Sequence, residues 1–489
     1  MALAPSIPMT TVPNLLQLGS VFCGVFAITI YLVARFRKGN DPRYPPIIQI
    51  TTAEQFTKTR DAYGEALQKH GPVIGVWRKG RLEYVTDKTY VKEVLTQDHI
   101  FSFEEGAFEI LNLRFLLAFR GREFFCHVED LVLEGIVRPL QEITSRLFPV
   151  VDRRTQAYVD MACRGSSTIG QGADFKEFCH QVVVENMMFV TFGQHLDQSH
   201  LKTVATLETD LSTMMGMFQN TDFFSRTFPA TWRILAFMRV FIFTVIPGFL
   251  FVLGPHIWRA INAFEQTHKH SANIAEDNDI GLVRLLAKKW IDTKTGQVSV
   301  LRRMWIVIIV AGFVFASVHN TTIVTVWVMY ELARRPEYLQ QLRDELAQIS
   351  ESGEIRLTSA SLKGATHLDS FIREVLRLKG DTISQVRRST CDAPLGKYII
   401  PQGHLITTLA TTVNEDPDVL GHDATAFDGF ACPGRGLAVN EIKLLILTFI
   451  AKATPTLKPG SYKVTDPMNT AAVAPTAVLL VERLKDPLF

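Results

Sequence analysis

The chain has 489 residues, enough for a large buried core, and its composition excludes several classes of protein. Hydrophobic residues make up 47% and charged residues 20%, which excludes an intrinsically disordered chain. Lysine and arginine total 51 against 49 acidic residues, so no net charge attracts nucleic acid or another polyanion. The six cysteines are scattered without C-x-x-C spacing, so we interpret them as reduced thiols on the cytosolic side.

The N-terminal segment predicts a membrane anchor. Residues 13–34 are 22 positions without a charge, enough to cross a bilayer core as a helix. Arg35, Arg37 and Lys38 follow directly, and such a basic cluster favours a cytosolic location for the rest of the chain. A cleaved signal peptide is the alternative, but it needs a positively charged start and a shorter apolar stretch. We therefore predict a single-pass anchor with its basic flank over residues 1–38.

The sequence after the anchor predicts a short linker and one domain. Residues 39–50 include Pro42, Pro45 and Pro46, which stiffen an extended chain between membrane and domain. Residues 51–489 show no repeat of 20 to 50 residues and are read as one compact domain.

Periodicity indicates a fold that is mainly α with minor β. Two short β-type runs around a basic turn predict a hairpin over residues 71–77 and 82–86. Apolar residues at three- and four-residue steps then predict helices over residues 180–220, 255–290, 301–335, 337–350 and 366–379.

A second apolar stretch covers residues 240–258, interrupted by Pro247-Gly248 and Gly254-Pro255. These breaks argue against a straight span, and arginines flank the stretch. We expect a helical pair that dips into one leaflet of a membrane. A second transmembrane helix is the alternative by length alone.

The most informative stretch is residues 427–438, which place Cys432 just before a helical run over residues 439–450. A helix N-terminus favours a thiolate over a thiol, the state that binds iron. A simply buried cysteine is the alternative. However, Cys-Pro-Gly-Arg-x-x-Ala followed by residues 440–443 resembles the haem-ligand motif of cytochrome P450 enzymes, especially fungal ones. The resemblance implies the cytochrome P450 fold and a haem, iron-protoporphyrin IX, with Cys432 as the metal ligand.

Glu374 and Arg377 lie one helical turn apart and can pair. By the resemblance they are the family's structural ion pair, because the surrounding segments follow the family's order. Glu331 and Arg334 repeat the same spacing, to which we assign no role.

Three basic residues are candidates for contacts to the haem propionates. One of Arg387 and Arg388 is expected to hold a propionate, since a guanidinium offers a planar fork to a carboxylate. An exposed surface arginine is the alternative. His127 corresponds by the resemblance to a propionate contact on an early helix, and a plain surface histidine is its alternative.

The apolar helix that begins near Met304 carries polar residues in its middle, which are costly in a core unless paired or used. The family places an acid and then a threonine beside the bound oxygen, to relay protons. Here His319 and Asn320 stand at those places, followed by Thr321, and we assign these three residues to oxygen activation. A satisfied buried polar pair is the alternative.

The chain departs from the family's pattern just before the cysteine. The loop that usually reads Phe-x-x-Gly-x-x-x-Cys has Thr425 at the phenylalanine position, Asp428 at the glycine position and Phe430 at the basic position. The phrase at residues 427–430 aligns better with an earlier family segment, so a few dozen residues are missing. The gap would remove the arginine that completes the network of Glu374 and its partner. A wrongly joined coding sequence and a real degenerate paralogue both explain it.

The resemblance implies a monooxygenase that uses haem, dioxygen and electrons from NADPH-cytochrome P450 reductase to oxidise a hydrophobic small molecule such as a terpenoid or steroid. It also implies a location on the cytosolic face of the endoplasmic reticulum membrane. The rival is a catalytically inactive relative, or a truncated gene product, with a defective haem pocket. A membrane protein without haem is a third hypothesis.

Overall fold

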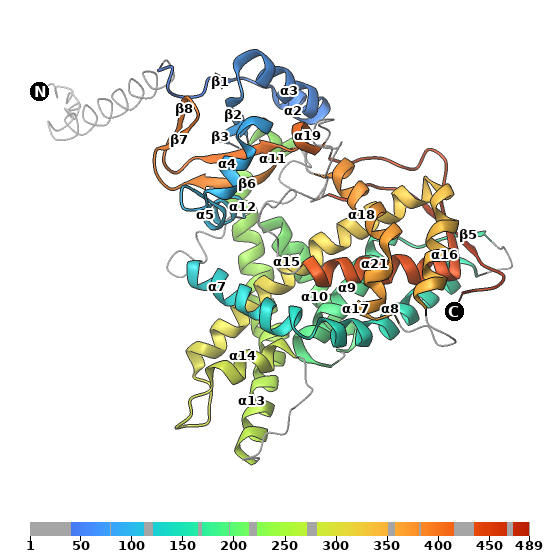
Figure 1. Ribbon diagram of the computed structural model, residues 1–489. Coiled ribbons are helices and arrows are strands. Elements are labelled where there is room, and N and C mark those ends of the chain that lie inside the picture. Colours follow the sequence, from blue (N-terminus) through green and yellow to red (C-terminus); the bar gives the residue numbers. More distant parts are fainter. Residues whose placement is uncertain are drawn as a thin grey trace, which may run out of the picture.

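The computed structural model describes residues 41–78, 80–111, 121–164, 169–194, 196–214, 223–270, 281–350, 357–380, 383–414, 435–466 and 473–488. Over these ranges the chain is mainly helical with minor strands, as the periodicity predicts. Figure 1 shows a sheet-rich part at the N-terminal side and a larger helical part beside it, with α15 running through the middle. The anchor predicted at residues 1–38 and Cys432 lie outside the described residues.

The largest sheet has six strands in the order β1-β2-β3-β9-β6-β4. Their bounds are β1 Ile47–Ile48, β2 Val73–Arg78, β3 Arg81–Thr86, β4 Phe101–Ser102, β6 Ile383–Ser389 and β9 Leu405–Leu409. Strands β2 and β3 pair antiparallel, which confirms the predicted hairpin. Strand β1 pairs parallel to β2, and Ile399 N donates to the Arg43 carbonyl at 2.7 Å, so the end of the proline-rich segment is joined to the domain.

Two smaller sheets complete the β structure among the described residues. One contains β5 Ile169–Gln171, β10 Ala453–Leu457 and β11 Leu479–Arg483, and the other is the hairpin of β7 Ala393–Leu395 and β8 Tyr398–Ile400.

The helices before α15 cover both sides of the molecule. Those near the sheet are α2 Thr52–Thr57, α3 Thr59–His70, α4 Val91–Thr96, α5 Phe103–Ile110, α11 Phe223–Thr227 and α12 Pro229–Val240. Those of the helical part are α7 Gly121–Val132, the π-helical η2 Leu133–Val137, α8 Leu140–Ala162, α9 Phe175–Phe192, α10 Gln198–Met214, α13 Gly254–His270 and α14 Leu282–Trp290. The region predicted as one helix over residues 180–220 is two, because Gly193 adopts a left-handed φ of 73° and ends α9.

The later helices include two short ones, over residues 359–364 and 411–414, that the periodicity did not predict, and the others follow the predicted ranges closely. The later helices are α15 Val300–Ala333, α16 Leu339–Ile349, α17 Ser359–Gly364, α18 Thr366–Lys379, α19 Thr411–Asn414 and α21 Arg435–Lys452. Helix α21 contains the run predicted at residues 439–450, and it begins three residues after Cys432.

Helix α15 lies at the centre of the main hydrophobic core. It packs against α9, α21, α10, α14, α18 and β10, and Ile306, Ile309 and Val326 are fully buried. It is the single helix among the described residues that is long and apolar enough to span a membrane, and 67% of its most apolar window is buried inside the protein. Its apolar composition is therefore that of a core helix.

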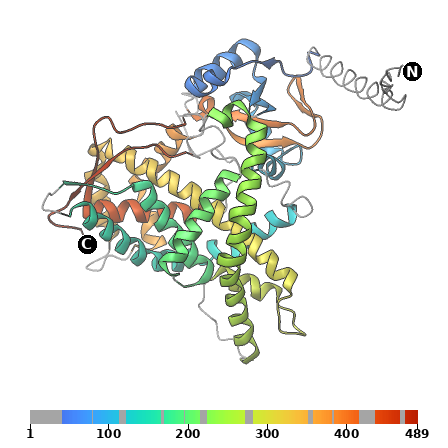
Figure 2. The same ribbon diagram turned by 180° about the vertical axis from the view of Figure 1, so that it is seen from behind.

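The prediction of two breaks in residues 240–258 is wrong. Helical turns run without interruption from α12 through the π-helical η3 Phe241–Val245 and η4 Gly248–Leu253 into α13, and Figure 2 shows the resulting long rod. Pro247 and Pro255 each follow shortly after a π-helical segment. Proline has no amide N–H to donate to the helix. A π turn changes the pattern of backbone hydrogen bonds locally, so the helix continues past the proline.

Glu331, to which the sequence analysis assigned no role, is the centre of a buried ionic cluster. Its side chain is 1% exposed and is contacted by Arg334 at 3.0 Å, by Arg335 and by Lys379 at 3.6 Å. The Tyr462 hydroxyl also donates to it at 2.8 Å. Burial raises the pKa of Glu331, but these hydrogen bonds and charges outweigh burial and the pKa is lowered. The cluster ties α15 to α18 and to the C-terminal segment.

Candidate functional site

The middle of α15 has an accessible strip between positions that are buried. Ala316 and Asn320 are exposed and Ser317 is partly exposed, whereas the neighbouring positions Phe315 and Val318 are buried. With 100° of rotation per residue, the three accessible positions lie within about 100° of the helix circumference. This strip is the part of the central helix that a bound molecule can contact.

The three residues assigned to oxygen activation do not share this strip. Asn320 lies on it. His319 is 6% exposed and faces α10, where its Nδ1 lies 3.3 Å from the Ser212 hydroxyl. Thr321 is 4% exposed, and its carbonyl accepts a hydrogen bond from Thr325 at 2.7 Å. Of these three residues the structure thus brings only Asn320 to accessible space, whereas His319 lies in a buried polar contact with Ser212.

Helix α7 packs closely on α15 just before the strip. A Cβ placed on Gly312 would lie 2.4 Å from Phe124 Cζ, so only glycine permits this approach. His127, one turn further along α7, lies between Trp290 and Trp305, and the Trp305 indole N–H donates to its Nδ1 at 3.1 Å. Burial lowers the pKa of His127. The indole therefore selects the tautomer in which the other ring nitrogen, Nε2, carries the proton.

Arg387 and Arg388 have opposite environments on β6. Arg388 Nη1 lies 2.9 Å from Glu105 of α5 and its Nε donates to the Gly403 carbonyl at 2.9 Å. Arg387 is 4% exposed, and although its Nη1 donates to the Val386 carbonyl at 3.2 Å, its buried Nε has no hydrogen-bond partner among the described residues. Its guanidinium carbon lies 5.1 Å from the Phe103 ring centroid. Burial lowers the pKa of Arg387, and the charge of Asp98 opposes this only in part.

Backbone geometry explains how β6 presents Arg387. The register with β9 shifts between Ser384 and Arg387, and Gln385 has a φ of 58°. Such a bulge re-aims the side chains that follow it. Gly106 of α5 then lies against the Arg387 backbone, where a Cβ would be 3.0 Å from Arg387 Cα. The strand and helix therefore fix this arginine from both sides.

Glu374 and Arg377 form the ion pair predicted from their spacing, with two contacts of 2.8 and 2.5 Å. Glu374 is 53% exposed. Arg377 Nη1 also donates to the Asn414 carbonyl at 2.9 Å. Asn414 is the last described residue before the segment 415–434 that contains Cys432. The pair therefore holds the chain where that segment begins.

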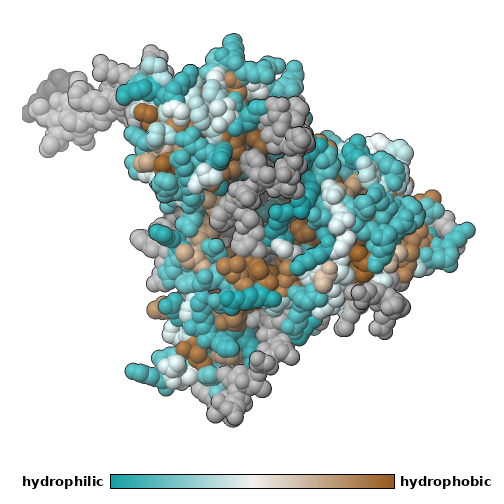
Figure 3. Space-filling model, viewed as in Figure 1, coloured by the Kyte–Doolittle hydropathy of each residue, from teal (hydrophilic) through white to brown (hydrophobic). Residues whose placement is uncertain are grey.

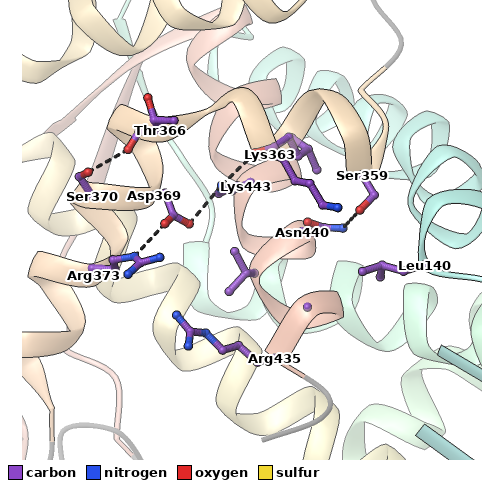
Figure 4. A pocket seen from close by; sticks show the side chains of 13 residues that line it. Leu140, Ser359, Lys363, Thr366, Asp369, Ser370, Arg373, Arg435, Asn440 and Lys443 are labelled. Atoms are coloured by element: carbon purple, nitrogen blue, oxygen red, sulfur yellow. Dashed lines mark hydrogen bonds and ion pairs between the residues drawn. The ribbon is translucent and has the colours of Figure 1, made fainter. Parts of the chain in front are cut away.

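A hollow of about 630 Å³ lies between α8, α17, α18 and the first turns of α21. Figure 4 shows Lys363, Arg373 and Arg435 reaching toward it from three different helices. Asp369 is the acidic lining residue, and it already pairs with Arg373 at 2.8 Å and with Lys443 at 3.2 Å. Four cations against one carboxylate leave the lining of this hollow positively charged.

Sequence reasoning missed Ser212, Phe124 and Glu105, which decide the roles of their neighbours. Each contact joins positions more than 100 residues apart: Ser212 with His319, Phe124 with Gly312, and Glu105 with Arg388. The one usable signal was the glycine in an apolar helix, which indicates a close packing contact. Among the described residues, no group of three or more histidine, cysteine, aspartate or glutamate side chains is placed to hold a metal ion.

Comparison with known proteins agrees with the resemblance. A family model described as cytochrome P450 matches residues 42–428, ending four residues before Cys432. Similar curated proteins include cytochrome P450 monooxygenase atmQ of Aspergillus flavus, 31% identical over 28% of this chain and 32% of that protein. Cytochrome P450 monooxygenase gliF of Aspergillus fumigatus is 28% identical over 27% of this chain and 34% of that protein. Cytochrome P450 4c21 of Blattella germanica is 26% identical over 35% and 38%. The matched part spans about a third of these relatives.

Proposed function

Because the chain belongs to the cytochrome P450 family, we propose that it is a haem-dependent monooxygenase acting on a hydrophobic small molecule. The family match over residues 42–428 is the observation that carries this proposal. The relatives named monooxygenase, most of them fungal, support it. Terpenoids, steroids and other secondary metabolites are the proposed substrate class, with dioxygen as co-substrate.

The family implies a haem cofactor, and the described residues fit its anionic groups. Arg387 is a buried guanidinium whose Nε lacks a partner, so a propionate would supply the missing acceptor and countercharge. Arg388 already has Glu105, so it does not need one. The tautomer of His127 set by Trp305 leaves Nε2–H available as a further donor to a propionate. We propose Cys432 as the iron ligand, three residues before α21 begins.

Side chains of α15 have separate proposed roles beside the cofactor. Haem supplies dioxygen activation and oxygen insertion when it is bound. Asn320, on the accessible strip of α15, is proposed to hold a water or the substrate by hydrogen bonds from its amide. His319 and Thr321 are proposed to act behind it, with His319 oriented by Ser212. Phe313 and Phe315 pack around this part of the helix and exclude bulk water.

The first prediction concerns Cys432. The reduced wild-type protein under carbon monoxide should show the red-shifted Soret band of thiolate-ligated haem, and Cys432→Ser should lose it because a hydroxyl does not replace the thiolate. The matched control is Cys391→Ser, since Cys391 is exposed in the turn before β7. It should keep the full band. A wild-type protein without the band would instead support the inactive relative, which the departure from the family's pattern before Cys432 favours.

The second prediction separates Arg387 from Arg388. Arg387→Leu should raise the rate of haem loss about tenfold or more, the effect of one charge-assisted hydrogen bond. The same change removes an uncompensated buried charge, so the haem-free protein should unfold at an equal or higher temperature. Arg388→Leu should leave haem transfer to apomyoglobin nearly unchanged while lowering stability, because Glu105 loses its partner. Equal haem loss from both variants would contradict the assignment.

NADPH-cytochrome P450 reductase is the proposed electron donor, and the positively charged hollow at α17, α18 and α21 is its proposed contact surface. The charge of the lining supports this proposal. Lys363, Arg373 and Arg435 carry more positive charge than the single lining carboxylate, Asp369, can neutralise. An acidic protein surface complements this charge. The hollow also lies at the start of the helix that follows Cys432.

The third prediction tests this surface. Lys363→Glu should raise the reductase concentration needed for half-maximal reduction by about three- to tenfold at low salt, and the difference should shrink as salt increases. Lys397→Glu is the control, because Lys397 lies in the β7–β8 turn and does not line the hollow. Both variants should keep the wild-type absorption spectrum. An unchanged dependence on reductase in Lys363→Glu would remove this surface from the proposal.

Location at the endoplasmic reticulum membrane, with a cytosolic domain, is also proposed. The uncharged residues 13–34 supply the anchor. A second contact with lipid is proposed along α11, α12 and the two π-helical segments, whose apolar side chains are unusually exposed. Examples are Phe223 at 80%, Ile234 at 65%, Phe243 at 75% and Phe251 at 78% exposure. Such an apolar face on a long helix is suited to the interface of a bilayer.

The fourth prediction separates the two membrane contacts. The full chain should remain in microsomes after alkaline carbonate extraction. A variant without residues 1–38 should still float with vesicles, and Phe243→Glu with Phe251→Glu should weaken that flotation about tenfold or more, because burial of each ring is lost. The control is Met161→Glu, which alters an equally apolar exposed residue on α8. Flotation that does not change in the double variant would contradict the second contact.

A further inference from the structure

Glu441 of α21 is a titratable side chain in the deep core that no step above uses. It is 1% exposed and sits in the middle of a helix in which residues 440–452 are all buried. Among the described residues its hydrogen-bond partner is Asn186 of α9, whose Nδ2 donates to Glu441 Oε1 at 3.0 Å. Asn186 is fully buried, and its Oδ1 has no hydrogen-bond partner.

The orphaned amide oxygen decides the protonation state of its neighbour. A carboxylate offers only acceptors, so an ionised Glu441 would leave Asn186 Oδ1 buried without a donor. A neutral carboxylic acid carries one O–H, and that proton is the donor which Asn186 Oδ1 lacks. The acid and the amide then each donate one hydrogen bond to the other and accept one from it.

The surrounding charges do not favour an ionised Glu441. Burial raises the pKa of Glu441, and the hydrogen bond from Asn186 lowers it only in part. The resulting pKa is about 8. Several charged and titratable groups on α21 and the elements around it have other partners or line the hollow. They are Glu185 with Arg153 and Arg154, Asp152 with Lys452, Asp369 with Lys443, Arg343 with the Ile450 carbonyl, Glu345 with the His367 amide, His319 with Ser212, and Lys363 and Arg373 in the hollow.

We propose that Glu441 is a neutral acid which, paired with Asn186, positions the helix that follows Cys432. The pair connects α21 directly to α9, two helices that otherwise meet mainly through α15 and α8. Glu441 lies nine residues after Cys432, so a shift of α21 would move the proposed iron ligand. This last consequence rests on the proposed function, whereas the neutral pair does not.

The pair predicts a definite dependence of stability on pH. The folded pKa is raised above the unfolded value of 4.5, so unfolding releases a proton at pH values between the two. This contribution to stability is fully present below pH 4.5 and is lost as pH rises through about 8. Over that window each pH unit should favour unfolding by about tenfold in the equilibrium constant. Above about pH 8 Glu441 ionises in the folded protein, which leaves a buried charge and removes the O–H that Asn186 Oδ1 would accept from.

The experiment compares wild type, Glu441→Gln and Glu331→Gln by thermal unfolding from pH 5 to pH 9. Glutamine keeps both hydrogen bonds to Asn186 and cannot ionise, so Glu441→Gln should match wild type near pH 5 and be more stable at pH 8. Glu331 is equally buried but is held as an anion by Arg334, Arg335 and Lys379. Its replacement should destabilise the protein at neutral pH. Superimposable pH profiles for wild type and Glu441→Gln would overturn the proposal.

Infrared spectroscopy supplies a second measurement that needs no stable variant. Wild type at pH 7 should show the C=O band of a protonated carboxyl group in the folded state, and the band should disappear as pH rises past about 8. Absence of a titrating band at pH 7 would overturn the proposal even if Glu441→Gln failed to fold. Neither readout requires haem, so failure of the proposed function leaves the test intact. With haem bound, Glu441→Gln should keep the thiolate spectrum to higher pH than wild type.

Discussion

The burial of α15 is the constraint on which the rest of the structure depends. A helix of 34 residues with an apolar surface on nearly every side has to be covered by other elements, and α9, α10, α14, α18, α21 and β10 are among those that pack against it. In the middle of the helix the covering is interrupted along the strip of Ala316, Ser317 and Asn320, so the same packing that stabilises the core leaves an accessible line at its centre. The position of the candidate site follows from where this cover is interrupted.

Among the described residues, buried ionisable side chains show three different environments. Glu331 and Glu83 are held as anions by arginines, and Arg78 and Arg81 outweigh burial to lower the pKa of Glu83 to about 2. Glu441 meets only an amide, so burial dominates its protonation. Arg387 lies beside an aromatic ring and forms no ion pair among the described residues, and the more distant charge of Asp98 does not outweigh its burial. Removing a charge from water costs free energy in all three cases. Ion pairing offsets that cost at Glu331 and Glu83, neutralisation avoids it at Glu441, and at Arg387 it indicates that an external anion binds.

The fold was largely predictable because its signal is local. The periodicity located α15 and α18 to within a residue or two, and alternation located the β2–β3 hairpin. The stretch at residues 240–258 was misread because proline was taken as a helix breaker, whereas π turns absorb it here. The site was less predictable. Asn320 and His319 are adjacent in sequence yet face different neighbours, and Ser212, which orients His319, lies 107 positions away. No sequence pattern identifies such a partner.

Helix α18 holds both flanks of the segment that contains Cys432. On the incoming side Arg377 donates to the Asn414 carbonyl, immediately before residues 415–434. On the outgoing side Asp369 pairs with Lys443 of α21, the helix that the segment enters. Both attachments come from one short helix, itself joined to the core through Lys379 and Glu331. The exposed pair of Glu374 and Arg377 adds little stability as a surface ion pair. Its value lies in aiming the Arg377 guanidinium at Asn414, which fixes the chain at the end of α19, where the segment begins, while the contact of Asp369 with Lys443 fixes α21, where it ends.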